Sequence, residues 1–536
     1  MQWSIGARDL FMMLQRLENL AVPSTFRTLL TAEEAYPALE REFIAASSEI
    51  WASFRIFDPM TRLRSPEARA IGRTWFDLII ATLRRGVSIT IVITDFDPVA
   101  RAELHRATWR SVRVLIAAAE LGGPGARLRV IPAMHPARTG LLLRILFCPV
   151  IIAKQARTAR WLNGRSDEER RAAIREMPGV AACLIKRPNG RYRPKVFPFP
   201  LLYPATHHQK VAVFDRKRLY LGGLDLDERR YDTPRHDRDA AQTWHDVQVL
   251  VDGPAAREAQ EHLETFLDAT AGKRKPANTR RLLRTLSQPR QNNPFRFGPK
   301  PLVQELALAH EHLARRAKRL IFVETQFFRD LKLARYLADL GRSRPDLGMI
   351  LILPGAPEDV AFKPHVGLDA RFGEFLQYRA LRILTKGFGA RLFIGAAAQP
   401  RPKNGPSPNE TERDHVEGAP LIYIHSKVSI FDDSAAIVSS ANLNGRSLRW
   451  DTEAGLFITS KRDVQALRRK VLRHWLSDDA GPEFFDPSQA VDAWRTMALA
   501  NAETPPTSRR GFIVPHDLEA TKKVAANVPI LPDEMV

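Results

Sequence analysis

The chain has 536 residues, of which 44% are hydrophobic and 26% charged, so its composition excludes a disordered chain and suits two large globular domains. Its 81 Lys and Arg outnumber 60 Asp and Glu, and the formal net charge of +21 indicates either a polyanionic partner or simply a solvated basic surface. Two cysteines, Cys148 and Cys183, exclude a disulfide framework and fit a reducing compartment.

Taken in chain order, residues 1–20 lack a basic stretch followed by an unbroken apolar core, so we expect no signal peptide. Residues 38–59 predict a helix followed by a short apolar strand, and 87–98 and 125–136 predict further strands. The apolar stretch 141–153 is too short to span a bilayer, which needs about 20 residues. We expect it to be a buried helix or strand; the alternative is an element that dips into one leaflet.

The chain repeats itself. The segment HHQKVAVFDRKRLYLGGLDL (207–226) matches IHSKVSIFDDSAAIVSSANL (424–443) at a constant offset of 217 residues. Three upstream pairs also match: 38–59 with 307–330, 87–98 with 347–359, and 125–136 with 389–400. Strands therefore alternate with helices in each half, which predicts an α/β fold of two similar halves, each a mainly parallel sheet flanked by helices.

Composition suggests where the halves meet. The first half carries an insert, 136–203, and inserts at a sheet end often shape access to a site. Residues 399–420 are rich in Pro, Asn and Gly and predict an exposed loop. The predicted organisation is an N-terminal half (1–270), a basic linker (271–302), a C-terminal half (303–480) and a tail (481–536).

Each repeat contains the pattern H-x-K-x4-D: His208, Lys210 and Asp215, then His425, Lys427 and Asp432. The adjoining segments VAVFD and VSIFD predict strands, where a period of two brings His and Lys to one face. An imidazole beside an ammonium suits phosphate chemistry, because the Lys neutralises oxygens while the His attacks or donates a proton. The two Asp fall at odd spacing, so we expect them to point away and be structural. One such pattern arises by chance, whereas two at one offset indicate function.

Small and polar residues follow both motifs. Small residues let backbone amides approach a phosphate, and an Asn side chain donates to it. The resulting candidates for substrate binding are Gly223 and Asp225 after the first motif, and Ser440 and Asn442 after the second.

These patterns resemble the phospholipase D superfamily, which is defined by paired H-x-K-x4-D motifs, and within it the eukaryotic-like branch of bacterial phospholipases D. WHDVQVLVDGPAA (244–256) resembles the first catalytic region, and SSANLNGRS after the second motif resembles the second. FVETQFF (322–328) resembles the strand between the halves. The likeness covers residues 30 to 475, although Ser439 stands where the family usually has Gly. It implies pseudo-twofold related halves with one active site at their interface.

The resemblance also implies a two-step mechanism. One His attacks phosphorus and forms a phosphohistidine, and the other protonates the departing alcohol and then activates water or an acceptor alcohol. It places the nucleophile at His208, with Glu453 orienting His208 across the interface and Asp246 orienting His425. Further residues that it places near the pocket are Glu324 and Gln326.

The activity that the resemblance implies is hydrolysis of glycerophospholipids to phosphatidic acid and an alcohol, with transphosphatidylation as a second outcome. The alternatives are a phosphatidyltransferase similar to cardiolipin synthase, whose members usually carry N-terminal membrane helices not expected here, and a nuclease of the same superfamily. A degenerate lipid-binding protein is the remaining alternative, and the intact His and Lys of both motifs argue against it.

No cofactor is expected, because two His and two Lys perform this chemistry unaided. No metal site is expected either, since His207, His236 and His245 are not spaced as a ligand set. The expected partners are a phospholipid substrate and, transiently, an anionic membrane surface; nucleic acid is not expected, and we expect a monomer. The expected location is the cytoplasm or the membrane periphery, with export by a non-classical route left open.

Overall fold

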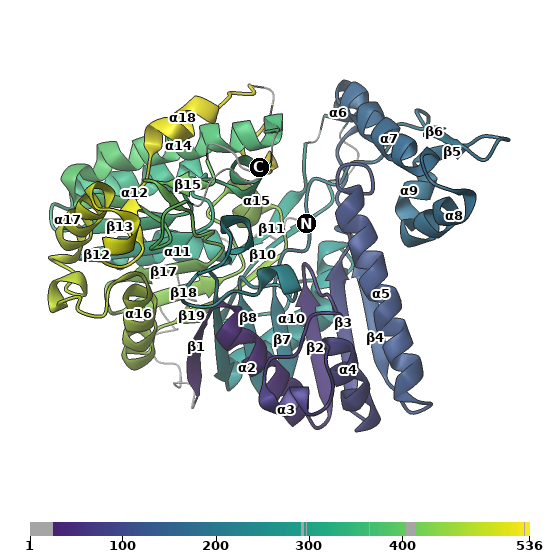
Figure 1. Ribbon diagram of the computed structural model, residues 1–536, viewed down its shortest axis with the longest axis horizontal. Coiled ribbons are helices and arrows are strands. Elements are labelled where there is room, and N and C mark those ends of the chain that lie inside the picture. Colours follow the sequence, from purple (N-terminus) through teal and green to yellow (C-terminus); the bar gives the residue numbers. More distant parts are fainter. Residues whose placement is uncertain (1–24, 291–293, 296, 364, 404–412, 530) are drawn as a thin grey trace.

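The computed structural model describes residues 25–290, 294–295, 297–363, 365–403, 413–529 and 531–536. Two sheets form the centre of the molecule, and helices cover their outer faces (Figure 1). The segment 1–20, for which no signal peptide is expected, lies outside the described residues, as does the middle of the expected loop 399–420.

The first sheet has seven strands and contains the first motif. Across the sheet the order is β1 (Phe26–Leu30), β9 (Val247–Asp252), β8 (Arg218–Gly222), β7 (Val211–Phe214), β2 (Glu49–Phe54), β3 (Ser88–Thr94) and β4 (Leu128–Ala133). The main helices around it are α2 (Thr31–Ala45), α4 (Trp75–Arg84), α5 (Ala102–Gly122) and α10 (Pro254–Thr270). The apolar run of β3 forms a strand because it is covered on both faces.

The second sheet has nine strands and repeats the same central order. Its strands are β11 (Lys300–Gln304), β10 (Leu282–Gln288), β19 (Glu453–Ile458), β18 (Ala435–Ser439), β17 (Lys427–Phe431), β12 (Leu320–Thr325), β13 (Gly348–Leu353), β14 (Leu392–Ala397) and β20 (Ile513–Pro515). The main helices around it are α11 (Glu305–Arg316), α12 (Leu331–Ser343), α14 (Leu368–Phe388), α16 (Lys461–Trp475) and α17 (Ala490–Glu503).

The α/β class is confirmed, but the strand directions are mixed rather than mainly parallel. In each sheet only three neighbouring strands run parallel, β2–β3–β4 and β12–β13–β14, and the remaining pairs are antiparallel. The reason is that the strands after each motif, β7–β8–β9 and β17–β18–β19, return through short turns, which only antiparallel pairing allows.

Part of the segment expected as a linker belongs to the second sheet instead, since 271–302 supplies β10 and the start of β11. Arg284, one of its basic residues, is buried because its guanidinium binds Glu305 at 2.7 and 2.9 Å. The tail 481–536 is also folded, and it adds α17, the edge strand β20 and α18 (Leu518–Val524) to the second half. Basic composition alone therefore did not separate an ion-paired strand from a solvated linker.

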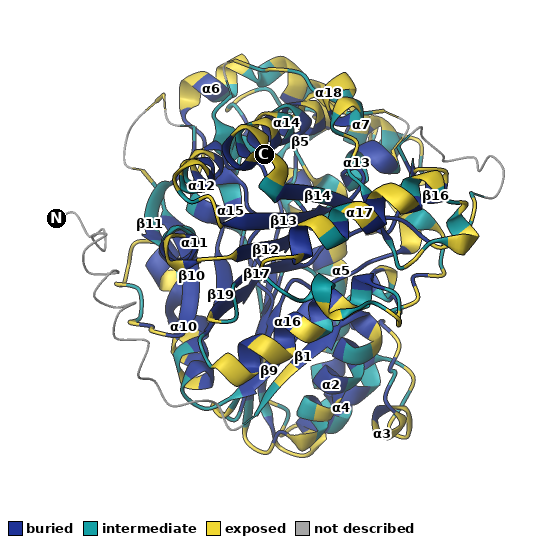
Figure 2. Cartoon of the chain, turned by 90° about the vertical axis from the view of Figure 1, so that its left-hand side faces the viewer, coloured by how far each residue is buried: buried dark blue, intermediate teal, exposed yellow. Residues whose placement is uncertain are grey.

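The two sheets share one hydrophobic core. The same cluster of buried side chains contains Val249 from the first sheet, Val438 from the second, and Leu263 and Leu467 from helices α10 and α16. Figure 2 shows the buried strands β12 and β13 enclosed by helices whose outer faces are exposed. The halves are therefore joined through their interiors.

The insert 136–203 forms a small lobe at one edge of the molecule (Figure 1). It contains α6 (Leu141–Leu146), α7 (Cys148–Asn163), α8 (Asp167–Glu176), α9 (Pro178–Ala182) and the hairpin β5 (Leu184–Lys186) and β6 (Tyr192–Pro194). Its apolar stretch is not the buried element expected. Only one face of these short helices packs, so Leu143 and Ile151 are buried, while Leu141, Leu142, Ile145, Leu146 and Val150 are exposed. Among the described residues, no helix combines the length and apolarity that crossing a membrane requires.

Candidate active site

Backbone hydrogen bonds join the two halves beside both motif histidines. The amide of His208 donates to the carbonyl of Thr452 at 2.8 Å, and the amide of His425 donates to the carbonyl of His245 at 2.8 Å. Each motif enters the strand that carries it just after its histidine, since β7 begins at Val211 and β17 at Lys427. The strand edges thus bring residues 217 positions apart to one place.

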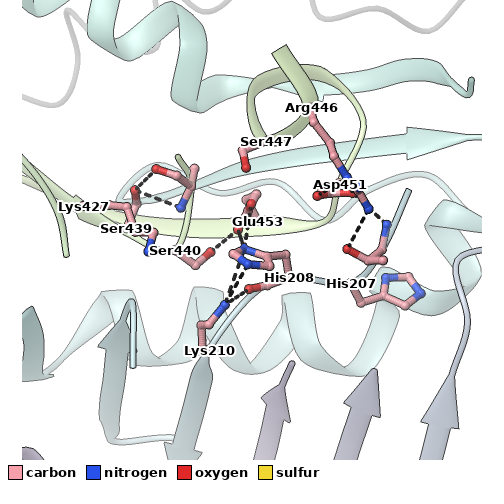
Figure 3. A network of polar contacts seen from close by, with 12 residues as sticks. His207, His208, Lys210, Lys427, Ser439, Ser440, Arg446, Ser447, Asp451 and Glu453 are labelled. Carbon is pink, nitrogen blue, oxygen red and sulfur yellow. Dashed lines mark hydrogen bonds and ion pairs between the residues drawn. The ribbon is translucent and has the colours of Figure 1, made fainter. Parts of the chain in front are cut away.

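In the first pair, His208 faces Glu453 of the other half (Figure 3). Its Nδ1 lies 3.0 Å from Glu453 Oε1, and the hydroxyl of Ser440 donates to the same carboxylate. Lys210 Nζ lies 3.3 Å from His208 Nε2 and donates to the His208 carbonyl at 2.7 Å. Lys210 and Glu453 are completely buried.

In the second pair, His425 faces Asp246 of the first half. Its Nδ1 lies 2.7 Å from Asp246 Oδ2, and Lys427 Nζ lies 3.0 Å from the same nitrogen. Lys427 also donates to the His425 carbonyl. The two pairs act on each other electrostatically, because the charge of Lys427 lowers the pKa of His208 and that of Lys210 lowers the pKa of His425. They form one site.

Burial sets the protonation of this site. It lowers the pKa of both motif histidines well below the ordinary value, which keeps both imidazoles neutral. It also lowers the pKa of Lys427 to about 7 and raises that of Glu453 to about 8 and that of Asp246 to about 6. A bound oxyanion would oppose the shift of Lys427, because its negative charge favours the ammonium form. The arrangement can therefore hold a phosphate between two neutral imidazoles.

The residues after the motifs take different roles from one another. A Cβ on Gly223 would come within 2.2 Å of Asp246 Oδ1, so glycine here makes room for that carboxylate. Asp225 accepts from the amide of Ile56 at 2.9 Å and is thereby engaged within the protein. The buried Oδ1 of Asn442, in contrast, has no hydrogen-bond partner in the described structure.

The motif aspartates lie away from the histidines. Asp215 accepts from the amides of residues 47, 48 and 49, and Asp432 accepts from the amides of 318, 319 and 320, so each caps the start of a neighbouring strand. Both adopt the left-handed conformation, with φ of 50°. Although burial acts in the opposite direction, these hydrogen bonds hold the pKa of Asp215 well below its ordinary value.

Gln326 and Glu324, both expected in the pocket, separate in the structure. Gln326 Nε2 donates to Tyr423 Oη at 2.8 Å, and Tyr423 packs on Trp244, whose ring centroid lies 4.6 Å from that of His425. Glu324 does not line the pocket. It is fully buried behind it, because its carboxylate accepts from His245 at 2.9 Å and from the side chains at 426 and 475.

Sequence reasoning missed two arginines of the site. Arg55, just after β2, lowers the pKa of His208, and Arg230, whose guanidinium lies 3.4 Å from the ring centroid of Trp244, lowers that of His425. Neither lies at a repeat position, so the sequence offered no signal for them. The repeat did mark Arg446, which binds Asp451 at 2.9 Å near His208 (Figure 3).

The histidines that were weighed as metal ligands also separate. His207 Nδ1 lies 2.8 Å from Thr452 Oγ1. His236 and His245, in contrast, meet a third histidine, His474 of α16, which the sequence gave no reason to include.

Comparison with known proteins gives one family match and several distant relatives. Residues 382–475 match the family model described as cardiolipin synthase, PLD-like domain. Phospholipase D gamma 1 of Arabidopsis thaliana is 23% identical over 417 residues, which are 54% of this chain and 48% of that protein. Phospholipase D alpha 1 of Nicotiana tabacum is 22% identical over 356 residues, covering 45% of this chain and 44% of that one. The chain thus spans about half the length of these relatives.

Among solved structures, the phosphatidylserine synthase of Haemophilus influenzae Rd KW20 aligns with 87% of this chain and 90% of its own. The sequence identity is 12% and the TM-score 0.49.

Proposed function

Since the chain belongs to the phospholipase D superfamily, we propose that it is a phospholipase D, which hydrolyses the distal phosphodiester of glycerophospholipids to phosphatidic acid and an alcohol. The observation that carries this proposal is the pairing of two buried His–Lys motifs, each with a carboxylate on the histidine Nδ1. Such pairing suits an attacking imidazole on one side of a phosphate and a proton donor on the other.

In the first step, Glu453 accepts the Nδ1 proton of His208, which directs the lone pair of Nε2 toward phosphorus. The P–Nε2 bond forms as the bond from phosphorus to the head-group oxygen breaks. His425 Nε2 gives its proton to that oxygen, and the head-group alcohol leaves. Lys210 and Lys427 balance the charge of the non-bridging oxygens.

In the second step, the phosphohistidine is discharged. His425 Nε2 takes a proton from water, the hydroxyl oxygen attacks phosphorus, and the P–N bond breaks so that its electron pair returns to His208 Nε2. Phosphatidic acid is released. An alcohol that enters in place of water gives a transphosphatidylation product by the same transfers.

A phosphatidyltransferase is the second candidate, and the match of 382–475 to a cardiolipin-synthase-like model favours it. Both candidates share the phosphohistidine and differ only in the acceptor.

The test uses the purified protein with vesicles of mixed phospholipids, with and without ethanol, and with plasmid DNA in a separate assay. We expect phosphatidic acid without ethanol, phosphatidylethanol with it, intact plasmid, and the same initial rates in EDTA. A control protein carrying both His208→Asn and His425→Asn should form neither lipid. Exclusive transfer to a lipid alcohol would favour the transferase, and nicked plasmid without lipid turnover would favour a nuclease.

We also propose that the insert lobe is the surface that contacts an anionic bilayer. Over 136–203 the sequence has fourteen Lys and Arg against four Asp and Glu, a net charge of +10. The exposed apolar face of α6 and the start of α7 lies on this lobe, with Leu146 52% and Val150 56% exposed, and Lys154 and Arg157 are exposed on α7. Apolar side chains among cations are what a monolayer-inserting surface requires.

Replacing Leu142 and Leu146 together by Glu tests the lobe as a membrane surface. We expect binding to phosphatidylglycerol-rich vesicles to fall about tenfold or more, because each buried Leu contributes about 1.5 kcal/mol or more. Leu499→Glu on α17, which replaces a leucine of similar exposure (52%), is the matched control and should bind normally. Unchanged binding of the double variant would refute this role.

A further inference from the structure

Three histidines from distant parts of the chain meet beside the active site. His236 lies between η2 (Glu228–Arg230) and η3 (Ala240–Gln242), His245 directly precedes Asp246, and His474 lies in the last turn of α16. One ring nitrogen of each lies within 4.8 Å of the other two. We propose that these three imidazoles bind a divalent transition metal ion, with Zn²⁺ as the probe, and that the ion is structural rather than part of the phosphate chemistry.

The spacing of the rings fits one ion. The ring centroids of His236 and His474 are 5.1 Å apart, those of His245 and His474 4.5 Å, and those of His236 and His245 5.5 Å. Three imidazoles that share a tetrahedral Zn²⁺ at about 2.0–2.1 Å per Zn–N bond place their centroids about 5 Å apart. His236 Nε2 and His474 Nε2 are 3.0 Å apart, close to the separation of two nitrogens on such an ion.

Carboxylates hold the outer nitrogens of two of these rings. His236 Nδ1 donates to Asp232 Oδ2 at 2.7 Å, and His245 Nε2 donates to Glu324 Oε1 at 2.9 Å. Both carboxylates are fixed by further donors, the amide of Trp244 to Asp232 and the indole at 475 to Glu324. A carboxylate behind a histidine sets its tautomer and leaves the other nitrogen as a lone pair, the arrangement that supports metal-ligating histidines.

The protein alone does not satisfy these lone pairs. His245 Nδ1 is buried and has no hydrogen-bond partner in the described structure. A neutral His474 has one N–H, which serves His236 and leaves His245 without a donor. A buried acceptor without a donor is costly, whereas one cation satisfies all three rings.

The surroundings suit an ion that enters once and stays. His236 and His245 are completely buried, while His474 is half-buried and offers the way in. Trp475 stacks on His236 at 6.1 Å, and Phe512 packs at 5.8 Å from the same ring, so apolar side chains close the far side. The ion would tie the loop that carries Asp246 to helix α16 of the other half, which stabilises the folded state.

The test uses the full chain without a histidine tag, dialysed against EDTA and then titrated with Zn²⁺ or Co²⁺. We expect uptake of about one ion per chain, a visible absorption band with Co²⁺ and a higher melting temperature. His474→Gln should abolish the band and weaken binding at least 100-fold, and Asp232→Asn, which removes no ligand, should weaken it about 10- to 100-fold. His415→Gln, at a half-exposed histidine outside the cluster, is the matched control and should bind normally.

Absence of uptake by the native protein would overturn the proposal, and so would unchanged affinity in His474→Gln. If His474→Gln does not fold, the Co²⁺ band of Asp232→Asn decides, since a site elsewhere would leave it unaltered. None of these readouts involves lipid turnover, so they stand whether or not the phospholipase proposal does.

Discussion

The two halves of the molecule build their motifs on the same backbone. Asp215 and Asp432 occupy the same left-handed turn and each accepts three amides at the start of the neighbouring strand. His208 and His425 each donate a backbone amide across the interface at 2.8 Å. The scaffold around each histidine is therefore a repeated structure.

The side chains that complete the two sites differ. Ser440 donates to Glu453, while the corresponding Gly223 has no side chain and leaves its space to Asp246. Burial raises the pKa of Glu453 to about 8 but that of Asp246 only to about 6. A duplicated scaffold thus carries two different acid–base environments, and the division of roles depends on these few side chains.

The largest expected effect comes from removing either histidine. His208→Asn and His425→Asn should each lower kcat by about 10³-fold or more, because groups that act as a unit are not additive. To separate the roles, His425→Asn is incubated with a substrate that has a good leaving group. We expect an acid-labile, alkali-stable adduct at residue 208. Label at His425 in His208→Asn, with none in His425→Asn, would reverse the roles.

A smaller effect is expected from Ser440→Ala. If the attack needs ionised Glu453 and the acid needs the proton of the Asp246–His425 pair, kcat/KM rises with pH to about 6, stays level, and falls above about 8. Loss of the donated hydrogen bond raises the pKa of Glu453, so the alkaline limb should move up by about one pH unit and the plateau should fall about tenfold.

Ser439→Ala is the control for that profile, since the hydroxyl of Ser439 contacts Ala441 rather than Glu453. An alkaline limb that stays in place in Ser440→Ala would remove Glu453 from the assignment.

The smallest effect is expected from Asp215→Asn and Asp432→Asn. Each should destabilise the fold by about 1 kcal/mol while kcat stays unchanged, because the carboxylates bind backbone amides and not substrate. The depressed pKa of Asp215 means that its contribution is present above the ordinary value of about 4 and disappears as pH falls below it. Thermal denaturation at several pH values measures this, with Asp346→Asn as an exposed control.

The sequence could predict the parts of this molecule that depend on repetition. The offset of 217 residues identified both motifs, and alternating strands and helices identified the α/β class. It could not predict strand direction, because short turns and long crossovers look alike as polar segments. The apolar stretch 141–153 was misjudged because periodicity does not say what covers a helix.

Residues without a repeat partner or a local pattern were beyond the sequence. Arg55 reaches the site only because β2 ends beside β7, and Glu324 leaves it because His245 and Trp475 take up its carboxylate. His474 joins His236 only once α16 has packed between the halves. Each of these contacts depends on tertiary packing rather than on spacing along the chain.

The shared core has a consequence for how the molecule unfolds. Because Val249 and Val438 belong to one buried cluster, and the strand ends beside both histidines exchange backbone hydrogen bonds, neither half has a complete interior of its own. Melting of one half strips apolar surface from the other, so the transition is cooperative across the whole chain. Loss of catalytic competence on heating and loss of the fold are then a single event.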